Sequence, residues 1–493
     1  MSTFHGLEMA KQALFAQRSA LHTTGHNISN ANTEGYSRQR VNFETMSPYP
    51  AGARNRPEIP GQIGTGVEAG SIERVRDQFL DKQYRAENSK AGYWETKSDA
   101  LARMENLMNE PSESGLSHTM DQFWQAIQEL AVNPDNSGAR SVVAQRGLAV
   151  SETFNYLADS LTSIRSDLET QIEITVMDAN SIIGDIDRVN KQINQLEPHG
   201  YLPNDLYDER DRLMDKLSSM MNIKTGASVN GESYPGTIEA VDNEGKSFEP
   251  PVILVNGEPG EEGTNEIKVE PPYNEITVVN AEGEPRNITS SNGSITGLIE
   301  AYGHDDNEDA VNLKSMLDDL DEMAVTFAEA FNEVHREGYG LDGSKENFFE
   351  SEITGAADLT VREEILNNPD KIAASADGTT GNGANASELA DIFNDRDLDG
   401  APLGENTSVN SFNQSLISKL GVAAQEANRM TNNTEILRTQ VENQRMSVSS
   451  VSLDEEMSNM IKFQHAYNAS ARSMTAMDEL LDRIINNMGL VGR

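Results

Sequence analysis

The residues best suited to chemistry in this 493-residue chain belong to a run that reads D-R-D-L-D-G from Asp395. Asp395, Asp397 and Asp399 alternate and a glycine follows them, as in the first half of a calcium-binding loop. The twelfth position of such a loop supplies a bidentate carboxylate, but Asn406 stands there and Glu405 comes one place early. The run is therefore a weak calcium candidate, and a solvated acidic loop is the favoured interpretation.

Three other polar groups could suggest catalysis or metal binding, and each has a simpler interpretation. His304 precedes two aspartates, but no second histidine lies at helical spacing, so a surface loop is favoured. Asp208 and Arg212 are spaced as an ordinary ion pair on a helix surface. His335 could be a general base, but its place at a helix end favours a helix-dipole contact. No nucleophile motif, phosphate loop or dinucleotide fingerprint occurs, so we predict no enzyme and no cofactor.

Charge and composition exclude several classes of function. The chain carries 39 basic and 80 acidic residues, a net charge of −41, which disfavours nucleic acid and anionic membranes as partners. There is no cysteine, so disulfides, thiol catalysis and cysteine-based metal sites are excluded. No apolar run is long enough to span a bilayer, and the N-terminus lacks a cleavable secretion signal. A cytoplasmic protein, or one exported without cleavage, fits these features.

The elements that carry these side chains are mostly helical. A zone from about residue 72 to 221 predicts a rod-like antiparallel bundle. Residues 224–294 are richer in Gly, Pro and strand-like runs and predict a small β-rich insertion. Helical patterns return at residues 295–335 and 412–488, around an irregular Gly-rich stretch at 338–410. The predicted fold class is mainly α with a β insertion, elongated and multi-domain.

The expected domains follow these changes of pattern. They are an N-terminal helix with a turn and an extended segment, a helical domain in two parts around the β-rich insertion, and a C-terminal coiled-coil helix. In chain order their bounds are 1–70, 71–223, 224–294, 295–452 and 453–493.

Both ends of the chain are amphipathic helices with heptad spacing. The N-terminal helix, expected over residues 4–28, repeats an apolar residue every seven positions. The C-terminal helix alternates four- and three-residue steps, interrupted by Gln464 and Asp478. Neither helix can bury its stripe alone, so we expect them to pack on each other or on other copies. The predicted assembly seam comprises Leu7, Leu14, Leu21, Ile28, Leu453, Met457, Met460, Tyr467, Leu481 and Ile485.

The N-terminal helix ends in a polar run, N-I-S-N-A-N-T-E-G-Y-S-R-Q at residues 27–39. Gly35 can adopt the left-handed conformation that a chain reversal needs. The run resembles the N-terminal signature shared by the flagellar axial proteins of bacteria (rod, hook and hook-associated proteins), with Glu34 where proline is usual. The residues of this turn motif are Asn27, Asn30, Asn32, Thr33, Gly35 and Tyr36.

Three further stretches are similar to the hook-associated protein 1 family within that group. They read D-L-Y-D-E-R-D-R-L at 205–213, N-E-V-H-R-E-G-Y-G-L-D-G at 332–343, and F-Q-H-A-Y-N-A-S-A at 463–471. In the last stretch, Phe463 replaces the tyrosine of the family. The resemblance covers both ends and most helical zones, whereas the β-rich insertion carries no matching motif.

The resemblance implies a structural, non-enzymatic protein that forms the junction ring between the flagellar hook and filament by helical self-assembly of its terminal helices. It implies export through the flagellar type III channel and an extracellular place in the flagellum. The implied partners are the hook protein, the second junction protein (hook-associated protein 3), other copies of the chain, and an export chaperone at the C-terminal helix. The alternatives are another axial protein, such as a hook or distal-rod subunit, and a surface calcium-dependent binding module or enzyme with axial-type ends.

Overall fold

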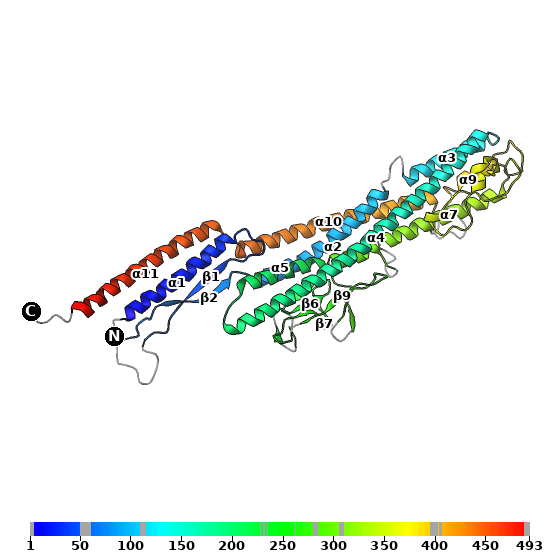
Figure 1. The fold of residues 1–493 in the computed structure, drawn as a ribbon. Helices are drawn as coiled ribbons and strands as arrows, with labels where there is room; N and C mark the ends of the chain where they lie inside the picture. Colours follow the sequence, from blue (N-terminus) through cyan, green and yellow to red (C-terminus); the bar gives the residue numbers. More distant parts are fainter. Residues whose placement is uncertain are drawn as a thin grey trace, which may run out of the picture.

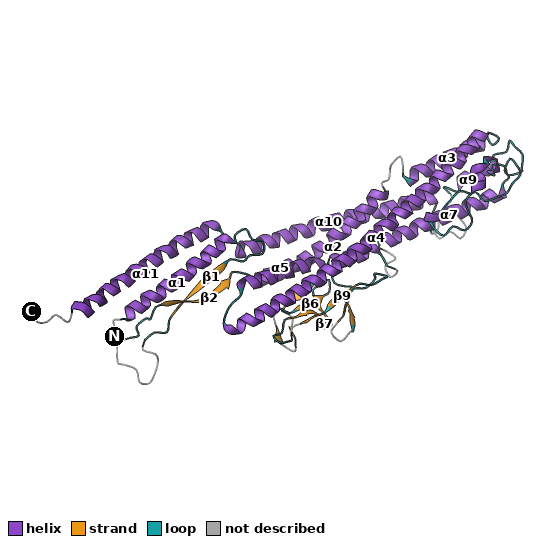
Figure 2. Cartoon of the chain, viewed as in Figure 1, coloured by secondary structure: helices purple, strands orange, loops and turns teal. Residues whose placement is uncertain are grey.

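The computed structural model describes residues 4–487, apart from 50–60, 109–114, 227, 230–231, 234, 262, 280–283, 305–309, 395–402 and 404–406. The chain forms an elongated stack of helices, with both ends of the chain at the same end of the molecule (Figure 1). Small antiparallel sheets lie along one side of the helices (Figure 2). The predicted fold class, mainly α with β-rich insertions, is therefore confirmed.

The two ends of the chain fold together as one unit. Helices α1 (His5–Ser29) and α11 (Leu453–Asn487) lie side by side and run in opposite directions (Figure 1). Strands β1 (Gln39–Thr45) and β2 (Val67–Arg74) form an antiparallel pair that packs against α1. We call these four elements the terminal module.

Long helices form the rod that leads away from the terminal module. Helix α2 (Gln78–Met108) packs on α10 (Val409–Ser449) and on α5 (Asn204–Met220). Helix α4 (Ser137–Leu196) packs on α5 and continues to the far end of the molecule (Figure 1). With 60 residues, α4 is about 90 Å long, given the helical rise per residue.

Helix α4 reaches this length because its apolar stripe has partners throughout. The Oδ1 of Asn136 starts the helix by accepting the backbone N–H groups of Gly138 (2.8 Å) and Ala139 (3.3 Å). Buried apolar side chains then recur along the helix from Val143 to Ile193. Besides α5, their helical partners include α3 (Leu116–Val132), α6 (Ser294–Tyr302) and α7 (Leu313–Glu337).

The far end of the rod holds an aromatic core. Gly147 of α4 admits this core, because a Cβ there would lie 2.6 Å from the ring of Phe348. The short helices α8 (Glu363–Asn367) and α9 (Ala384–Asp391) pack against α4 and α3 at this end. The fully buried rings in contact are those of Phe123, Phe327, Phe331, Phe348, Phe349 and Phe393.

His335, near the end of α7, lies inside this aromatic core and is uncharged. Its Nδ1–H donates to the carbonyl of Glu346 (2.6 Å), and its Nε2 accepts the backbone N–H of Ala373 (3.0 Å). Burial lowers the pKa of His335 from 6.5 to about 4. The predicted helix-dipole contact is therefore wrong, because a neutral ring held by two backbone groups offers no charge to the helix end.

The β-rich region folds against the side of α4. Asn180 exchanges two hydrogen bonds with the backbone of Ile267 (both 2.8 Å), and Asn190 donates to the carbonyl of Gly236 (2.9 Å). The strand orders are β3-β6-β7-β8, β11-β10-β9 and β4-β5, and the paired strands are antiparallel. The strands are β3 (Ile223–Thr225), β4 (Ser228–Val229), β5 (Glu232–Ser233), β6 (Ile238–Val241), β7 (Ser247–Asn256), β8 (Gly263–Thr264), β9 (Glu266–Lys268), β10 (Thr277–Val279) and β11 (Pro285–Asn287).

The helix expected over residues 412–488 is broken into two helices. Helix α10 ends at Ser449, and Ser450 has an extended backbone with ψ 156° before α11 begins at Leu453. The carbonyl of Ser449 accepts the backbone N–H of Arg38 (2.9 Å). The segment that follows α1 thus satisfies a carbonyl group of α10 that would bond within the helix if α10 continued.

We expect His335 to make the far end of the rod sensitive to acid. His335 has a pKa of about 6.5 in the unfolded chain and about 4 in the folded chain, so protons favour the unfolded chain in between. The contribution of His335 to the free energy of unfolding is therefore fully present above pH 6.5 and is lost as the pH falls toward 4. Between about pH 7.5 and about pH 5 the loss from this residue is about 2 kcal/mol. Urea unfolding, followed by the fluorescence of Trp124 in a Trp94→Phe background, measures the loss. In His335→Gln the loss of about 2 kcal/mol between pH 7.5 and pH 5 should vanish. A free energy of unfolding that depends on pH as strongly in the variant as in the natural chain would contradict the account.

Candidate functional site

The candidate functional site is the joint where the terminal module meets the rod. The chain leaves α1, reverses and enters β1 at this point. The reversal is made by backbone hydrogen bonds from Thr33 to Asn30 (2.9 Å) and from Tyr36 to Thr33 (3.2 Å). Gly35 has a φ of +79°, which a residue with a side chain adopts only with strain, and a Cβ there would lie 3.3 Å from the side chain of Arg212. Asn32, Thr33 and Gly35 are exposed, so they shape the reversal without joining the buried part of the joint.

One buried amide, that of Asn27, holds the reversal to both terminal helices. Its Oδ1 accepts the hydroxyl of Tyr36 (2.8 Å) and the backbone N–H of Gln39 (3.0 Å). Its Nδ2 donates to the carbonyl of Gln39 (2.8 Å) and to Oε2 of Glu456 in α11 (3.1 Å). Asn27 is 1% exposed, so these bonds are shielded from water. Burial, together with the nearby acids Asp205, Asp208 and Glu456, raises the pKa of Tyr36, which keeps its hydroxyl a donor.

Arg38 ties the same segment to the first turn of α11 by charge. Its Nε donates to Oε1 of Glu456 (2.8 Å), and its two terminal nitrogens donate to the two carboxylate oxygens of Glu455 (2.8 and 3.1 Å). Acids in the first turn of a helix also interact favourably with the helix dipole. The start of α11 is thus fixed by side chains that follow α1 in the sequence.

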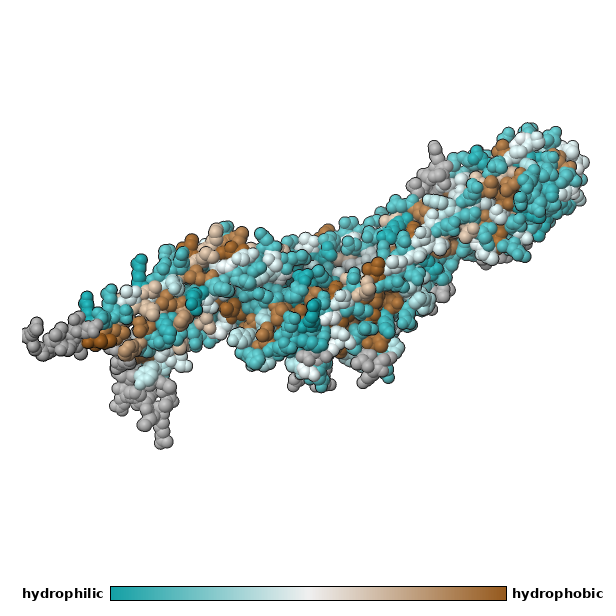
Figure 3. Space-filling model, in the orientation of Figure 1, coloured by the Kyte–Doolittle hydropathy of each residue, from teal (hydrophilic) through white to brown (hydrophobic). Residues whose placement is uncertain are grey.

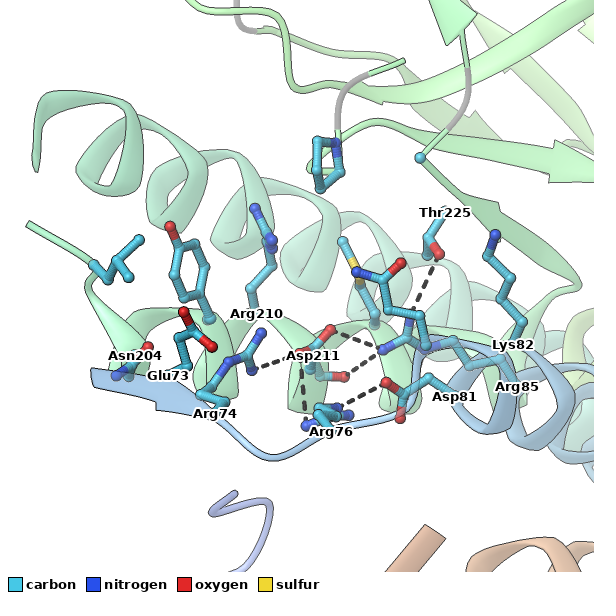
Figure 4. A pocket seen from close by; sticks show the side chains of 16 residues that line it. Glu73, Arg74, Arg76, Asp81, Lys82, Arg85, Asn204, Arg210, Asp211 and Thr225 are labelled. Carbon is cyan, nitrogen blue, oxygen red and sulfur yellow. Dashed lines mark hydrogen bonds and ion pairs between the residues drawn. The ribbon is translucent and has the colours of Figure 1, made fainter. Parts of the chain in front are cut away.

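A buried ionic network connects the terminal module to the rod (Figure 4). At its centre, Asp211 of α5 accepts from Arg74 (2.8 Å) and Arg85 (3.1 Å) and lies 3.5 Å from Arg76. Burial alone would raise the pKa of Asp211, but Arg76, Arg85 and Arg74 together lower it well below its usual range. Asp211 is therefore ionised, and it links the end of β2 to α2 and α5.

The network extends from Asp211 to α10 and to the reversal. Asp215, one turn further along α5, lies 2.7 Å from Arg85 and 2.5 Å from Arg445 of α10. Asp208, one turn earlier, accepts from Arg74 (2.8 Å) and from the backbone N–H of Ser37 (3.0 Å). The three aspartates occupy one face of α5 because they are spaced by three and four residues. This face holds segments from four parts of the chain in one geometry.

The ion pair predicted between Asp208 and Arg212 is wrong. The side chain of Asp208 is 8% exposed and faces the terminal module, whereas Arg212 pairs with Glu209 on the outer side of α5. Sequence spacing along the helix could not find the correct partner, because Arg74 lies 134 positions earlier in the chain.

The predicted assembly seam divides into buried and exposed parts. The fully buried face of α1 is made of small residues such as Ala10, Ala16 and Ala20, which let the neighbouring elements approach closely. The heptad residues lie beside that face. Leu481 is buried, whereas Leu7, Leu14, Leu21, Ile28 and Met460 are partly buried, and Leu453, Met457, Tyr467 and Ile485 are exposed.

The metal candidates lie mostly outside the part of the chain that the structure describes. Asp395, Asp397 and Asp399 lie outside the described residues, as do the two aspartates after His304, so these remain predictions. Among the residues that the structure describes, no three His, Asp or Glu side chains are close enough to hold a metal ion. In the same residues, no helix is long and apolar enough to cross a membrane.

We expect Asn27→Ala to loosen the joint strongly. The substitution leaves the Tyr36 hydroxyl and the Gln39 backbone without their buried partners, at a cost of about 2–4 kcal/mol. Hydrogen–deuterium exchange of the purified protein should then show faster exchange in β1 and at the start of α11. The matched control is Asn32→Ala, an exposed asparagine of the same reversal, which should change exchange little. Equal effects of the two variants would contradict the role of Asn27.

Comparisons with known proteins agree over the terminal module and the rod. Residues 101–349 match the family described as the flagellar hook-associated protein FlgK helical domain. Residues 7–36 match the flagella basal body rod protein family, and residues 442–488 match the C-terminal family of the flagellar basal body rod FlgEFG proteins.

Relatives with similar sequences span the whole chain. Flagellar hook-associated protein 1 of Bacillus subtilis is 44% identical over 100% of both chains. The protein of that name from Escherichia coli is 23% identical over 97% of this chain and 98% of its own. The solved structure of the flagellar hook junction protein FlgK from Burkholderia pseudomallei shares the fold, with a TM-score of 0.58 at 13% identity over 75% of this chain and 100% of that one. The chain therefore belongs to the flagellar hook-associated protein 1 family and is a structural component of the flagellar hook–filament junction.

Proposed function

We propose that this protein joins the hook to the filament by self-assembly through its terminal module, without a catalytic role. The observation that carries the proposal is the apolar surface that this module leaves exposed. On α11, Met457 is 53% exposed, Leu480 54% and Ile485 68%. Contiguous apolar surface on a soluble chain marks a site of contact with another protein.

The exposed apolar side chains are numerous enough to drive association. Burying each large one contributes about 1.5–3 kcal/mol. Brown, apolar residues are visible on the terminal module in the space-filling view (Figure 3). On α1, on α11 and at Phe4 directly before α1, the exposed large apolar residues are Phe4, Met9, Phe15, Leu453, Met457, Ile461, Tyr467, Met477, Leu480, Ile484 and Ile485.

The assembly contact joins unlike surfaces. The exposed residues of α1 and α11 differ, so the α11 face of one copy would pack on another face of the next copy. Such head-to-tail contacts continue from copy to copy and build a ring or a helical tube, depending on the rotation between neighbours. The buried joint sets the angle between the terminal module and the rod, which lets the rod point outward from the tube.

The remaining partners follow from the family. We propose that one edge of the assembly contacts the hook protein and the other contacts the second junction protein, hook-associated protein 3.

The chain would leave the cell through the flagellar type III channel without signal cleavage and act outside the cell. A chain without cysteine can be exported unfolded without forming disulfides on the way. Before export, a chaperone would cover the exposed face of α11.

We expect the double variant Met457→Asp, Ile485→Asp to fold normally but to fail in assembly. Both side chains are exposed in the monomer, so circular dichroism should be unchanged, whereas two charges in an apolar contact oppose association. Electron microscopy of purified hooks incubated with the variant should show uncapped hooks. The matched control is Val132→Asp, an apolar residue that is 78% exposed at the far end of the rod. Capping by the double variant at the level of the control would contradict the proposal.

The chaperone proposal has a separate test. Deletion of residues 453–493 removes α11 and its exposed apolar side chains. We expect pull-down of the flagellar export chaperone by the truncated chain to be lost, while the full chain retains it. Undiminished binding by the truncated chain would place the chaperone site elsewhere. That result would leave the assembly proposal intact, because capping of hooks is measured independently.

A further inference from the structure

A cavity of about 450 Å³ opens beside the ionic network, between α5, α2, the end of β2 and the edge of the β-rich region (Figure 4). Its charge is unusual for a chain with a net charge of −41. Five basic side chains line it, against three acidic ones. The basic residues are Arg74, Arg76, Lys82, Arg85 and Arg210, and the acidic residues are Glu73, Asp81 and Asp211.

The acidic residues of this wall are already engaged. Asp81 accepts from Arg76 (2.8 Å), and Asp211 accepts from Arg74 and Arg85. Glu73 accepts the hydroxyl of Ser71 (2.7 Å). None of these three acids forms an ion pair with Arg210.

Arg210 is a buried cation without a carboxylate partner among the described residues. It is 8% exposed, and no described acid lies within ion-pair distance of its guanidinium. Its Nη1 donates to Oδ1 of Asn190 (3.3 Å), and its Nε is buried without an acceptor. The guanidinium lies 5.4 Å from the ring centre of Tyr207, and that of Arg74 lies 5.0 Å from the same ring. Two guanidinium groups therefore meet around one tyrosine at the cavity wall.

This arrangement is costly unless an anion completes it. Burying a guanidinium without a counter-charge costs several kcal/mol. Burial lowers the pKa of Arg210, and the nearby charge of Arg74 adds to that effect although Asp211 opposes it. An uncharged side chain could fill the same space beside Tyr207 and Asn190 at a lower cost. The charge itself therefore calls for an explanation.

We propose that the cavity binds a small oxyanion of the phosphate or carboxylate type, held by Arg210 with Arg74 and reached past Lys82. The planar guanidinium fork presents parallel N–H donors that match two oxygens of such a group. Lys82 is exposed at the cavity rim and makes no ion pair with the described residues. The cavity wall includes Thr225 and Gly226, so the anion would link the terminal module, the rod and the β-rich region at one point.

Titration of the full-length monomer with inorganic phosphate, followed by ³¹P NMR at constant ionic strength, tests the proposal. We expect saturable binding that is weakened about tenfold or more in Arg210→Gln, since a charge-assisted hydrogen bond contributes about 1.5–3 kcal/mol. The matched control is Arg188→Gln, which removes an exposed arginine of α4 and should leave binding unchanged. If Arg210→Gln does not fold, Lys82→Gln, at the exposed rim, should still weaken binding severalfold.

A second measurement separates specific binding from a general salt effect. Phosphate should raise the melting temperature of the natural chain above that in chloride of equal ionic strength, and this increment should be absent in Arg210→Gln. Absence of saturable binding, or equal binding by the natural chain and Arg210→Gln, would overturn the proposal. If a carboxylate of a second copy fills the cavity instead, phosphate would show no saturable binding to the monomer, whereas Arg210→Gln would weaken self-association, and that result too would overturn a free-oxyanion site.

Discussion

The structure depends on one buried polar contact, in which the amide of Asn27 meets Tyr36, Gln39 and Glu456. The four hydrogen bonds of this amide join the end of α1, the reversal after it and the first turn of α11. The bond to Glu456 crosses from α1 to α11, so separating the two helices would take away this buried partner of Asn27. The two terminal helices are therefore held together by a directional hydrogen bond as well as by apolar contact.

The ionic network around Asp211 extends this constraint into the rod. Arginines from β2, the following link and α2 converge on the acidic face of α5, and Arg445 adds α10. A buried ion pair adds little net stability, but losing one partner costs about 3–5 kcal/mol, so the network strongly favours one arrangement. The exposed apolar face of α11 is the surface that we propose to bind neighbouring copies.

Much of this architecture could be predicted from local sequence patterns. The heptads predicted helices at both ends, and Gly35 with its asparagine neighbours predicted the chain reversal. The motifs at 27–39, 205–213 and 332–343 indicated the family that the comparisons confirm. These features are local, because they depend on residues a few positions apart.

The joint could not be predicted in this way because its partners are distant in the chain. Arg38 meets Glu456 across 418 positions, and Arg74 meets Asp208 across 134. The break between α10 and α11 had the same cause, since the Ser449 carbonyl bonds to Arg38.

Hydroxyl-radical footprinting of the monomer and of isolated hook–filament junctions would test the central claim most directly. The account predicts that Met457 and Ile485 become protected on assembly while Val132 and Tyr156 of the rod stay accessible. Protection of the rod residues with an accessible α11 would contradict it.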